Sequence, residues 1–167
     1  MKRRDFVRCG LLGAAVLGLS APVGAALFPP DPFFGQTFPD LNGQPIEIKH
    51  YLGQPLIVNF WATWCKPCVE EMPDLQRLHE AYPDVQFLGI GVDRAQNMRD
   101  FLRKVPVSYT ILEAGNAGVS VMRALGNRRG GLPFTVAFDE RGRIQDRLLG
   151  QIDPQVLEQR IERLLAS

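Results

Sequence analysis

Short continuous apolar runs and helically spaced apolar positions alternate along most of this chain, which predicts alternating strands and helices. The runs at 56–60 and 85–92 indicate buried strands. Between them, apolar residues recur at helical spacing: Val69, Met72, Leu75, Leu78 and Tyr82. The same reasoning predicts helices at 96–105, 119–125 and 154–165, and strands at 109–112, 134–138 and 143–149. This order predicts an α/β fold with a central mixed β-sheet flanked by helices.

Two prolines bear on the predicted helices. Pro73 falls inside the helix that contains Val69 and Leu78, and we expect it to kink that helix. Pro154 follows Asp153, and an acidic capping residue before a proline predicts that the last helix begins at Pro154.

The N-terminal part of the chain follows other patterns. Residues 1–26 have the layout of an export signal, because a basic start precedes an apolar run and then small residues suited to cleavage. Residues 27–35 are rich in Pro and Phe without periodicity, and we expect an irregular N-terminal arm there. Asn42-Gly43 is typical of a tight turn between two strands, so an N-terminal hairpin extension is expected before the main sheet.

The basic start resembles a twin-arginine export signal: Lys2-Arg3-Arg4-Asp5-Phe6-Val7-Arg8, with Lys2 in place of the usual Ser or Thr. The resemblance implies export of the folded protein to the periplasm. An ordinary secretory signal and a retained membrane anchor are the alternatives. Cys9 begins the apolar run instead of following it, which argues against lipid attachment.

Composition narrows the function mainly by exclusion. The 167 residues suffice for one domain with a substantial core, and we expect a monomer. The net charge of +1 gives no reason to expect nucleic acid as a partner. After cleavage of the predicted signal, Cys65 and Cys68 are the remaining cysteines. An exported protein whose two thiols share one motif is better suited to redox chemistry than to structural bridging.

Cys65 and Cys68 lie between the strand 56–60 and the helix that follows it. This places the sulfur of Cys65 at a helix N-terminus, where unpaired N–H groups and the helix dipole lower the thiol pKa below its usual value of about 8.5. Cys68 lies one turn further on the same face and can close a disulfide with Cys65. We therefore expect Cys65 to be the catalytic nucleophile and Cys68 to resolve the mixed disulfide.

A zinc site and a purely structural disulfide are the alternatives for this cysteine pair. Structural zinc takes four ligands, whereas the cleaved chain offers two cysteines and two separated histidines, His50 and His79. A bridge across so short a loop restricts the unfolded chain little. We expect neither a metal nor a cofactor.

The cysteine pair belongs to a longer segment: Val58-Asn59-Phe60-Trp61-Ala62-Thr63-Trp64-Cys65-Lys66-Pro67-Cys68, continued by Glu71-Met72-Pro73. This segment resembles the signature of the TlpA family of exported thioredoxin-like thiol-disulfide oxidoreductases. The loop Gly131-Leu132-Pro133-Phe134-Thr135 is similar to the one in which that fold holds a cis-proline facing the active disulfide. The resemblance covers about residues 36–165 and implies a thioredoxin-like domain over 36–167.

The resemblance also implies a substrate-binding surface around the disulfide, formed by Trp64, Pro67, Leu132 and Pro133. Pro67 has a structural role besides, because a proline without an N–H suits the first helical turn. Packing in the core is the alternative role for Trp64, and Trp61 is expected in the core.

Three positions near the cysteines modify the expected chemistry. Thioredoxin has a buried Asp where this chain has Asn59, which cannot titrate, and Lys66 adds a positive charge beside Cys65. Glu71, three residues after Cys68, is a third catalytic candidate, because it can share a helical face with that cysteine and carry its proton. It also matches a Glu that some TlpA-family reductases place near the active site. The alternative is a solvated residue of the first turn, as expected of Glu70.

The sequence leads to the hypothesis of an exported oxidoreductase that reduces disulfides of client proteins. The resemblance implies a membrane thiol transporter as electron donor, and clients in cytochrome c or metalloprotein maturation. The same exchange in reverse would make the protein a thiol oxidase, depending on its reduction potential.

Two other classes fit the sequence less well. A copper carrier on the same fold would need cysteines three residues apart and a later histidine, and no histidine follows His79. A peroxidase would need a lone cysteine in a Pro-x-x-x-Thr/Ser-x-x-Cys context, which the sequence lacks.

Overall fold

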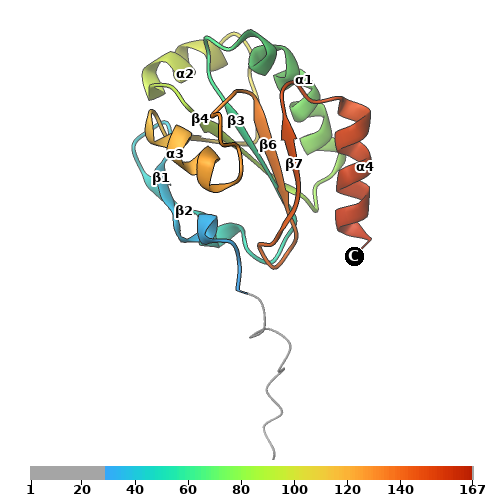
Figure 1. The fold of residues 1–167 in the computed structure, drawn as a ribbon. Coiled ribbons are helices and arrows are strands. Elements are labelled where there is room, and N and C mark those ends of the chain that lie inside the picture. Colours follow the sequence, from blue (N-terminus) through green and yellow to red (C-terminus); the bar gives the residue numbers. More distant parts are fainter. Residues whose placement is uncertain (1–28, 167) are drawn as a thin grey trace, which may run out of the picture.

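The computed structural model describes residues 29–166, which form a central five-stranded sheet flanked by helices (Figure 1). The strand order is β5-β4-β3-β6-β7. The strands are β3 (Leu56–Trp61), β4 (Gln86–Gly91), β5 (Thr110–Glu113), β6 (Phe134–Phe138) and β7 (Ile144–Leu149). β3, β4 and β5 run parallel, whereas β6 is antiparallel to both β3 and β7. The predicted α/β fold with a mixed sheet is thus confirmed.

Helices cover both faces of this sheet: α1 (Lys66–Ala81), α2 (Ala95–Leu102), α3 (Ala117–Ala124) and α4 (Pro154–Leu165). Figure 1 shows α1 and α4 together on one side of the sheet and α3 on the other. Successive side chains of a strand point to opposite faces, so β3 contributes to two hydrophobic clusters. Ile57 and Trp61 pack with α1 and α4, while Val58 and Phe60 pack with α3.

The expected start of the last helix is confirmed. The side chain of Asp153 accepts hydrogen bonds from the N–H groups of Gln155 and Val156, so α4 begins at Pro154 as predicted. α1 continues through the exposed Pro73, which cannot donate to the carbonyl of Val69.

The predicted N-terminal hairpin is present, formed by β1 (Thr37–Pro39) and β2 (Pro45–Glu47). Gly43 in the turn has a φ of 84°, a value that glycine adopts at little cost. A short 3-10 helix that the sequence pattern does not indicate, η3 (Ile48–Tyr51), then leads toward β3.

The irregular arm predicted for residues 27–35 is replaced at Pro32–Gly35 by a 3-10 helix, η2, capped by the side chain of Asp31. Phe33 and Phe34 are both buried against Phe138 of β6, with ring centroids 5.4 and 5.2 Å from that ring. This contact with the sheet explains why the segment is ordered despite its lack of periodicity. The predicted signal, residues 1–26, lies outside the described residues. Within residues 29–166, no helix has the length and apolar character needed to span a membrane.

Candidate active site

Cys65 and Cys68 form a disulfide at the N-terminus of α1, with their Cα atoms 5.3 Å apart. Cys65 is the N-cap residue, and its sulfur accepts a hydrogen bond from the N–H of Cys68 at 3.4 Å. The sulfur of Cys65 therefore lies where the helix dipole and unpaired N–H groups favour a thiolate. Cys65 is 6% exposed and Cys68 is fully buried, so an incoming thiol or disulfide reaches Cys65 first.

The residues around the disulfide differ sharply in exposure. Trp64 is 70% exposed, so the alternative in which it packs in the core is wrong; Trp61, 1% exposed, is the core tryptophan as predicted. Pro67 lies in the first turn of α1 and is half-buried. The ammonium of Lys66 is directed to Glu70, 3.6 Å from its carboxylate. This exposed ion pair partly offsets the positive charge that Lys66 brings to the disulfide.

The loop before β6 lies next to the disulfide because β6 is antiparallel to β3. Phe134, the first residue of β6, pairs with Phe60 near the end of β3, so the residues before Phe134 lie beside those after β3. The Leu132–Pro133 peptide bond is cis, as the resemblance implies. Leu132 is half-buried and packs against the hydrophobic cluster that contains both cysteines.

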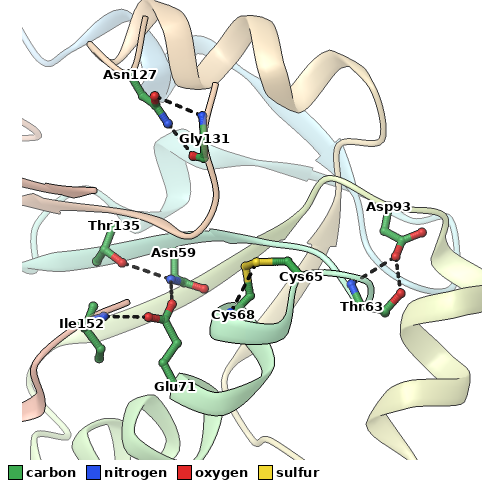
Figure 2. Close-up of a disulfide and its surroundings, with 10 residues drawn as sticks. All are labelled: Asn59, Thr63, Cys65, Cys68, Glu71, Asp93, Asn127, Gly131, Thr135 and Ile152. Atoms are coloured by element: carbon green, nitrogen blue, oxygen red, sulfur yellow. Dashed lines mark hydrogen bonds between the residues drawn. A yellow bond between two sulfur atoms is a disulfide. The ribbon is translucent and has the colours of Figure 1, made fainter. Parts of the chain in front are cut away.

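Glu71 is 1% exposed, so the solvated alternative for this residue is wrong. Figure 2 shows its carboxylate between Asn59 and Ile152. One oxygen accepts a hydrogen bond from the side-chain amide of Asn59 at 2.7 Å, and the other accepts one from the N–H of Ile152 at 2.8 Å. Asn59 also donates to the hydroxyl of Thr135 at 3.0 Å.

Burial raises the pKa of Glu71 to about 7, although the hydrogen bonds from Ile152 and Asn59 oppose the increase. Among the described residues, the carboxylate has no hydrogen bond to either sulfur. The exposed Glu70 pairs with Lys66 instead and has no such buried site. Glu71 is thus a buried group, one helical turn after Cys68, that can gain or lose a proton near neutral pH.

Asp93 fixes the loop that carries Trp64, a contact that sequence analysis missed. One carboxylate oxygen accepts from the N–H and the hydroxyl of Thr63; the other accepts from the N–H of Arg94 and the side chain of Asn97. Burial alone would raise the pKa of Asp93, but these hydrogen bonds outweigh it and lower the pKa. A signal was present in the sequence, because Asp93 follows β4 at the same edge of the sheet as the cysteines.

The two histidines contact residues other than the cysteines. His79 packs edge-on against Phe87 and Tyr109, and His50 lies near Glu47. In the part of the chain that the structure describes, no three His, Cys, Asp or Glu side chains are arranged to hold a metal ion.

Comparison with known proteins places this geometry among thiol-disulfide oxidoreductases. The model of the AhpC/TSA family matches residues 30–148. The thioredoxin-like protein YneN of Bacillus subtilis is 32% identical over 142 residues, covering 77% of this chain and 78% of YneN. The thiol-disulfide oxidoreductase ResA of Bacillus cereus is 27% identical over 128 residues, covering 75% and 72% of the two chains.

A solved structure extends the similarity to three dimensions. MTB dsbF, solved in mixed oxidised and reduced forms, superposes with a TM-score of 0.72 at 27% identity, over 82% of this chain and 99% of dsbF. The fold is therefore thioredoxin-like, with the hairpin extension that the sequence predicts. The chain belongs to the AhpC/TSA family, and within it to the TlpA-type thiol-disulfide oxidoreductases, with Cys65 and Cys68 as its redox pair.

Proposed function

We propose that this protein works outside the cytoplasm as a reductant of disulfides in other proteins. The observation that carries the proposal is the asymmetry of the disulfide: Cys65 caps α1 and reaches the surface, while Cys68 is fully buried behind it. The resemblance of the segment around the cysteines to the TlpA signature favours reduction over oxidation. The exported location is supported by the basic and apolar pattern of residues 1–26.

The reaction is a two-step exchange of one disulfide. The Cys65 thiolate attacks one sulfur of the client disulfide, which breaks that bond, forms a mixed disulfide and releases a client thiolate that takes up a proton. Cys68 then loses its proton and attacks the sulfur of Cys65, which releases the second client sulfur. The client gains two electrons, and the Cys65–Cys68 dithiol becomes a disulfide.

Glu71 supports the second step in this proposal. Cys68 is enclosed, so its proton must pass to a neighbouring group before it can attack. A carboxyl with a pKa of about 7 is divided between its two protonation states at neutral pH, which suits a group that both accepts and returns a proton. Asn59 and Ile152 hold its oxygens by hydrogen bonds, which keeps the group in place during both transfers.

The wider setting of the reaction follows from the resemblance. A membrane thiol transporter would re-reduce the Cys65–Cys68 disulfide. The clients would be proteins whose cysteines are needed for haem attachment or metal insertion. In this proposal the client-binding surface is formed by Trp64, Pro67, Leu132 and Pro133. The exposed Trp64 ring is its apolar part, whereas Pro133 is buried beneath the surface.

The reduction potential of the Cys65–Cys68 pair, measured by equilibration with glutathione, tests the direction. We expect a value below about −200 mV, in the range of thioredoxins and glutaredoxins. A value above about −180 mV would instead make the protein an oxidant of client thiols. A second assay, in which the pre-reduced protein is mixed with insulin, checks that the protein also reduces the disulfides of another protein.

A further inference from the structure

The side chain of Asn127 makes two hydrogen bonds to the backbone of the loop that precedes β6. Its amide nitrogen donates to the carbonyl of Gly131 at 2.7 Å, and its carbonyl oxygen accepts from the N–H of Gly131 at 3.3 Å (Figure 2). Both polar groups of Gly131 are therefore satisfied by one side chain. Asn127 is 4% exposed, which shields these hydrogen bonds from competition with water.

Asn127 is itself held firmly at the end of α3. Its N–H donates to the carbonyl of Met122 at 2.9 Å, and its carbonyl accepts from the N–H of Gly130 at 3.0 Å. Gly130 has a φ of 66°, which lets the chain reverse between Asn127 and Gly131. The position of Gly131 is thus set from the end of α3 through a tight, hydrogen-bonded turn.

The far side of the same loop is also fixed. Pro133 has no N–H, and its carbonyl accepts from the N–H of Gly150 at 2.9 Å. Leu132, between these two anchored neighbours, is different: within residues 29–166 neither its N–H nor its carbonyl takes part in a backbone hydrogen bond. Its side chain packs against both hydrophobic clusters, which holds the residue in position.

A residue with a free N–H and a free carbonyl, held in position on both sides, can pair with one residue of an extended strand. The loop lies beside the disulfide, so a polypeptide whose cysteine meets Cys65 also passes Leu132. We propose that Asn127 is a positioning residue for catalysis: it fixes Gly131 so that the peptide groups of Leu132 are aligned for a client strand. This inference rests on the proposed function, because it assumes polypeptide clients.

The test compares a polypeptide substrate with a small thiol. Asn127→Asp changes one NH2 group to an oxygen, so the variant keeps an acceptor for the N–H of Gly131 but sets an oxygen against its carbonyl. Asn116→Ala is the matched control, because Asn116 is exposed at the start of α3 and its side chain makes no capping hydrogen bond. Each protein is assayed for reduction of insulin over a range of concentrations, for the rate at which dithiothreitol reduces the disulfide, and for reduction potential.

We expect Asn127→Asp to raise KM for insulin roughly tenfold, the effect of losing one well-placed hydrogen-bonded contact. The rate with dithiothreitol, which is too small to pair with Leu132, should stay within about twofold of wild type, and so should the equilibrium constant with glutathione that gives the reduction potential. Every value for Asn116→Ala should stay within the same limit. An unchanged KM for insulin, or an equal loss with insulin and dithiothreitol, would overturn the inference in favour of a purely structural role.

A second measurement does not depend on how well the variant folds. A synthetic peptide disulfide is N-methylated at the residue next to its cysteine, which removes a donor to the carbonyl of Leu132. On wild-type protein this change should raise KM, and a KM equal to that of the unmodified peptide contradicts pairing at Leu132. If the wild-type protein oxidises peptide dithiols and does not reduce insulin, the proposed direction fails. The same KM comparisons, made in the oxidising direction, then decide the role of Asn127 separately.

Discussion

The carboxylate of Glu71 and the side-chain amide of Asn59 are joined by a 2.7 Å hydrogen bond in the protein interior. Asn59 belongs to β3 and Glu71 to α1, so the bond crosses from the sheet to the helix that carries the cysteines. In thioredoxin, whose fold this chain resembles, the buried acid is an Asp on the strand, at the position that Asn59 occupies here. In this chain the acid lies on the helix, and the strand supplies the amide that holds it.

The first prediction concerns the pH dependence of stability. The pKa of Glu71 is raised from 4.5 to about 7 in the folded state, so its contribution to stability is full below about pH 4.5 and is lost as the pH rises through about 7. The Glu71→Gln variant has no ionisable group at this position, so it does not lose stability as the pH rises through about 7. The free energy of unfolding should therefore shift in favour of the variant by roughly 3 kcal/mol at most between about pH 4 and about pH 8.

Urea unfolding of the oxidised proteins at several pH values measures this shift, and Glu70→Gln serves as the control because Glu70 is exposed. In the reduced proteins, Glu71→Gln should also lower the apparent pKa of Cys65, since a nearby carboxylate opposes thiolate formation. Stability and thiol titration curves that superpose on those of wild type would show that Glu71 does not titrate near neutral pH.

The second prediction separates the two cysteines. Cys65→Ser should abolish insulin reduction, because the thiol that reaches the surface is lost. Cys68→Ser should instead accumulate a mixed disulfide between Cys65 and a client, since the resolving thiol is absent. Mass spectrometry of the trapped species identifies the linked cysteine. Faster alkylation of Cys68 than of Cys65 in the reduced wild-type protein would reverse the two roles.

The third prediction concerns the exposed ring of Trp64. Trp64→Ala should change the free energy of unfolding by no more than about 0.5 kcal/mol, as is usual for exposed positions, but raise KM for a protein client. Val156→Ala is a suitable control, because Val156 is an apolar residue of α4 with 36% exposure. A KM unaffected by loss of the indole ring would remove Trp64 from the client-binding surface.

The fourth prediction concerns Asp93, whose two oxygens both accept hydrogen bonds. In Asp93→Asn one oxygen becomes a donor and faces other donors, either at Thr63 or at Arg94 and Asn97. We expect a loss of about 1–3 kcal/mol of stability at neutral pH. The pKa of Asp93 is lowered, so the deficit should shrink as the pH falls and the wild-type carboxylate takes up a proton. Thermal unfolding measures both effects, with Asp84→Asn as control because Asp84 is exposed. Equal deficits at neutral and acid pH would contradict the argument.

The fifth prediction concerns export. Replacing Arg3 and Arg4 together by Lys should leave the full-length precursor in the cytoplasm, because the twin-arginine route depends on that pair. Cell fractionation with detection of precursor and cleaved chain provides the measurement. Normal accumulation of the cleaved double variant in the periplasm would indicate the general secretory route.

The parts of the site that the sequence predicts are those determined by neighbouring residues. Cys65 lies at the start of a helix because an apolar strand ends a few residues before it, and the spacing to Cys68 then places the second sulfur one turn along. The chain after Asp153 is similar, because a capping side chain and a proline decide the helix start locally.

The remaining features depend on residues distant in sequence. The buried carboxylate of Glu71 is held by the N–H of Ile152, 81 residues later in the sequence. Glu70, its neighbour, has the same residue type and yet lies in solvent. Phe33 is ordered because Phe138 stacks on it, a pairing that no periodicity in residues 27–35 indicates. Such contacts are decided by tertiary packing, which patterns within one segment do not contain.

The contact between η2 and the sheet also determines at which end of the domain an upstream segment would be attached. The N–H of Asp31 donates to the carbonyl of Gly142, in the turn between β6 and β7, at the end of the sheet where β3 begins. Cys65 lies beyond the opposite end of β3, whose six residues span about 20 Å. In Figure 1 the described part of the chain begins at that first end, away from the start of α1. A tether attached through Pro29 would therefore hold the domain at the end near Gly142. The dithiol, at the opposite end, would stay accessible to other proteins.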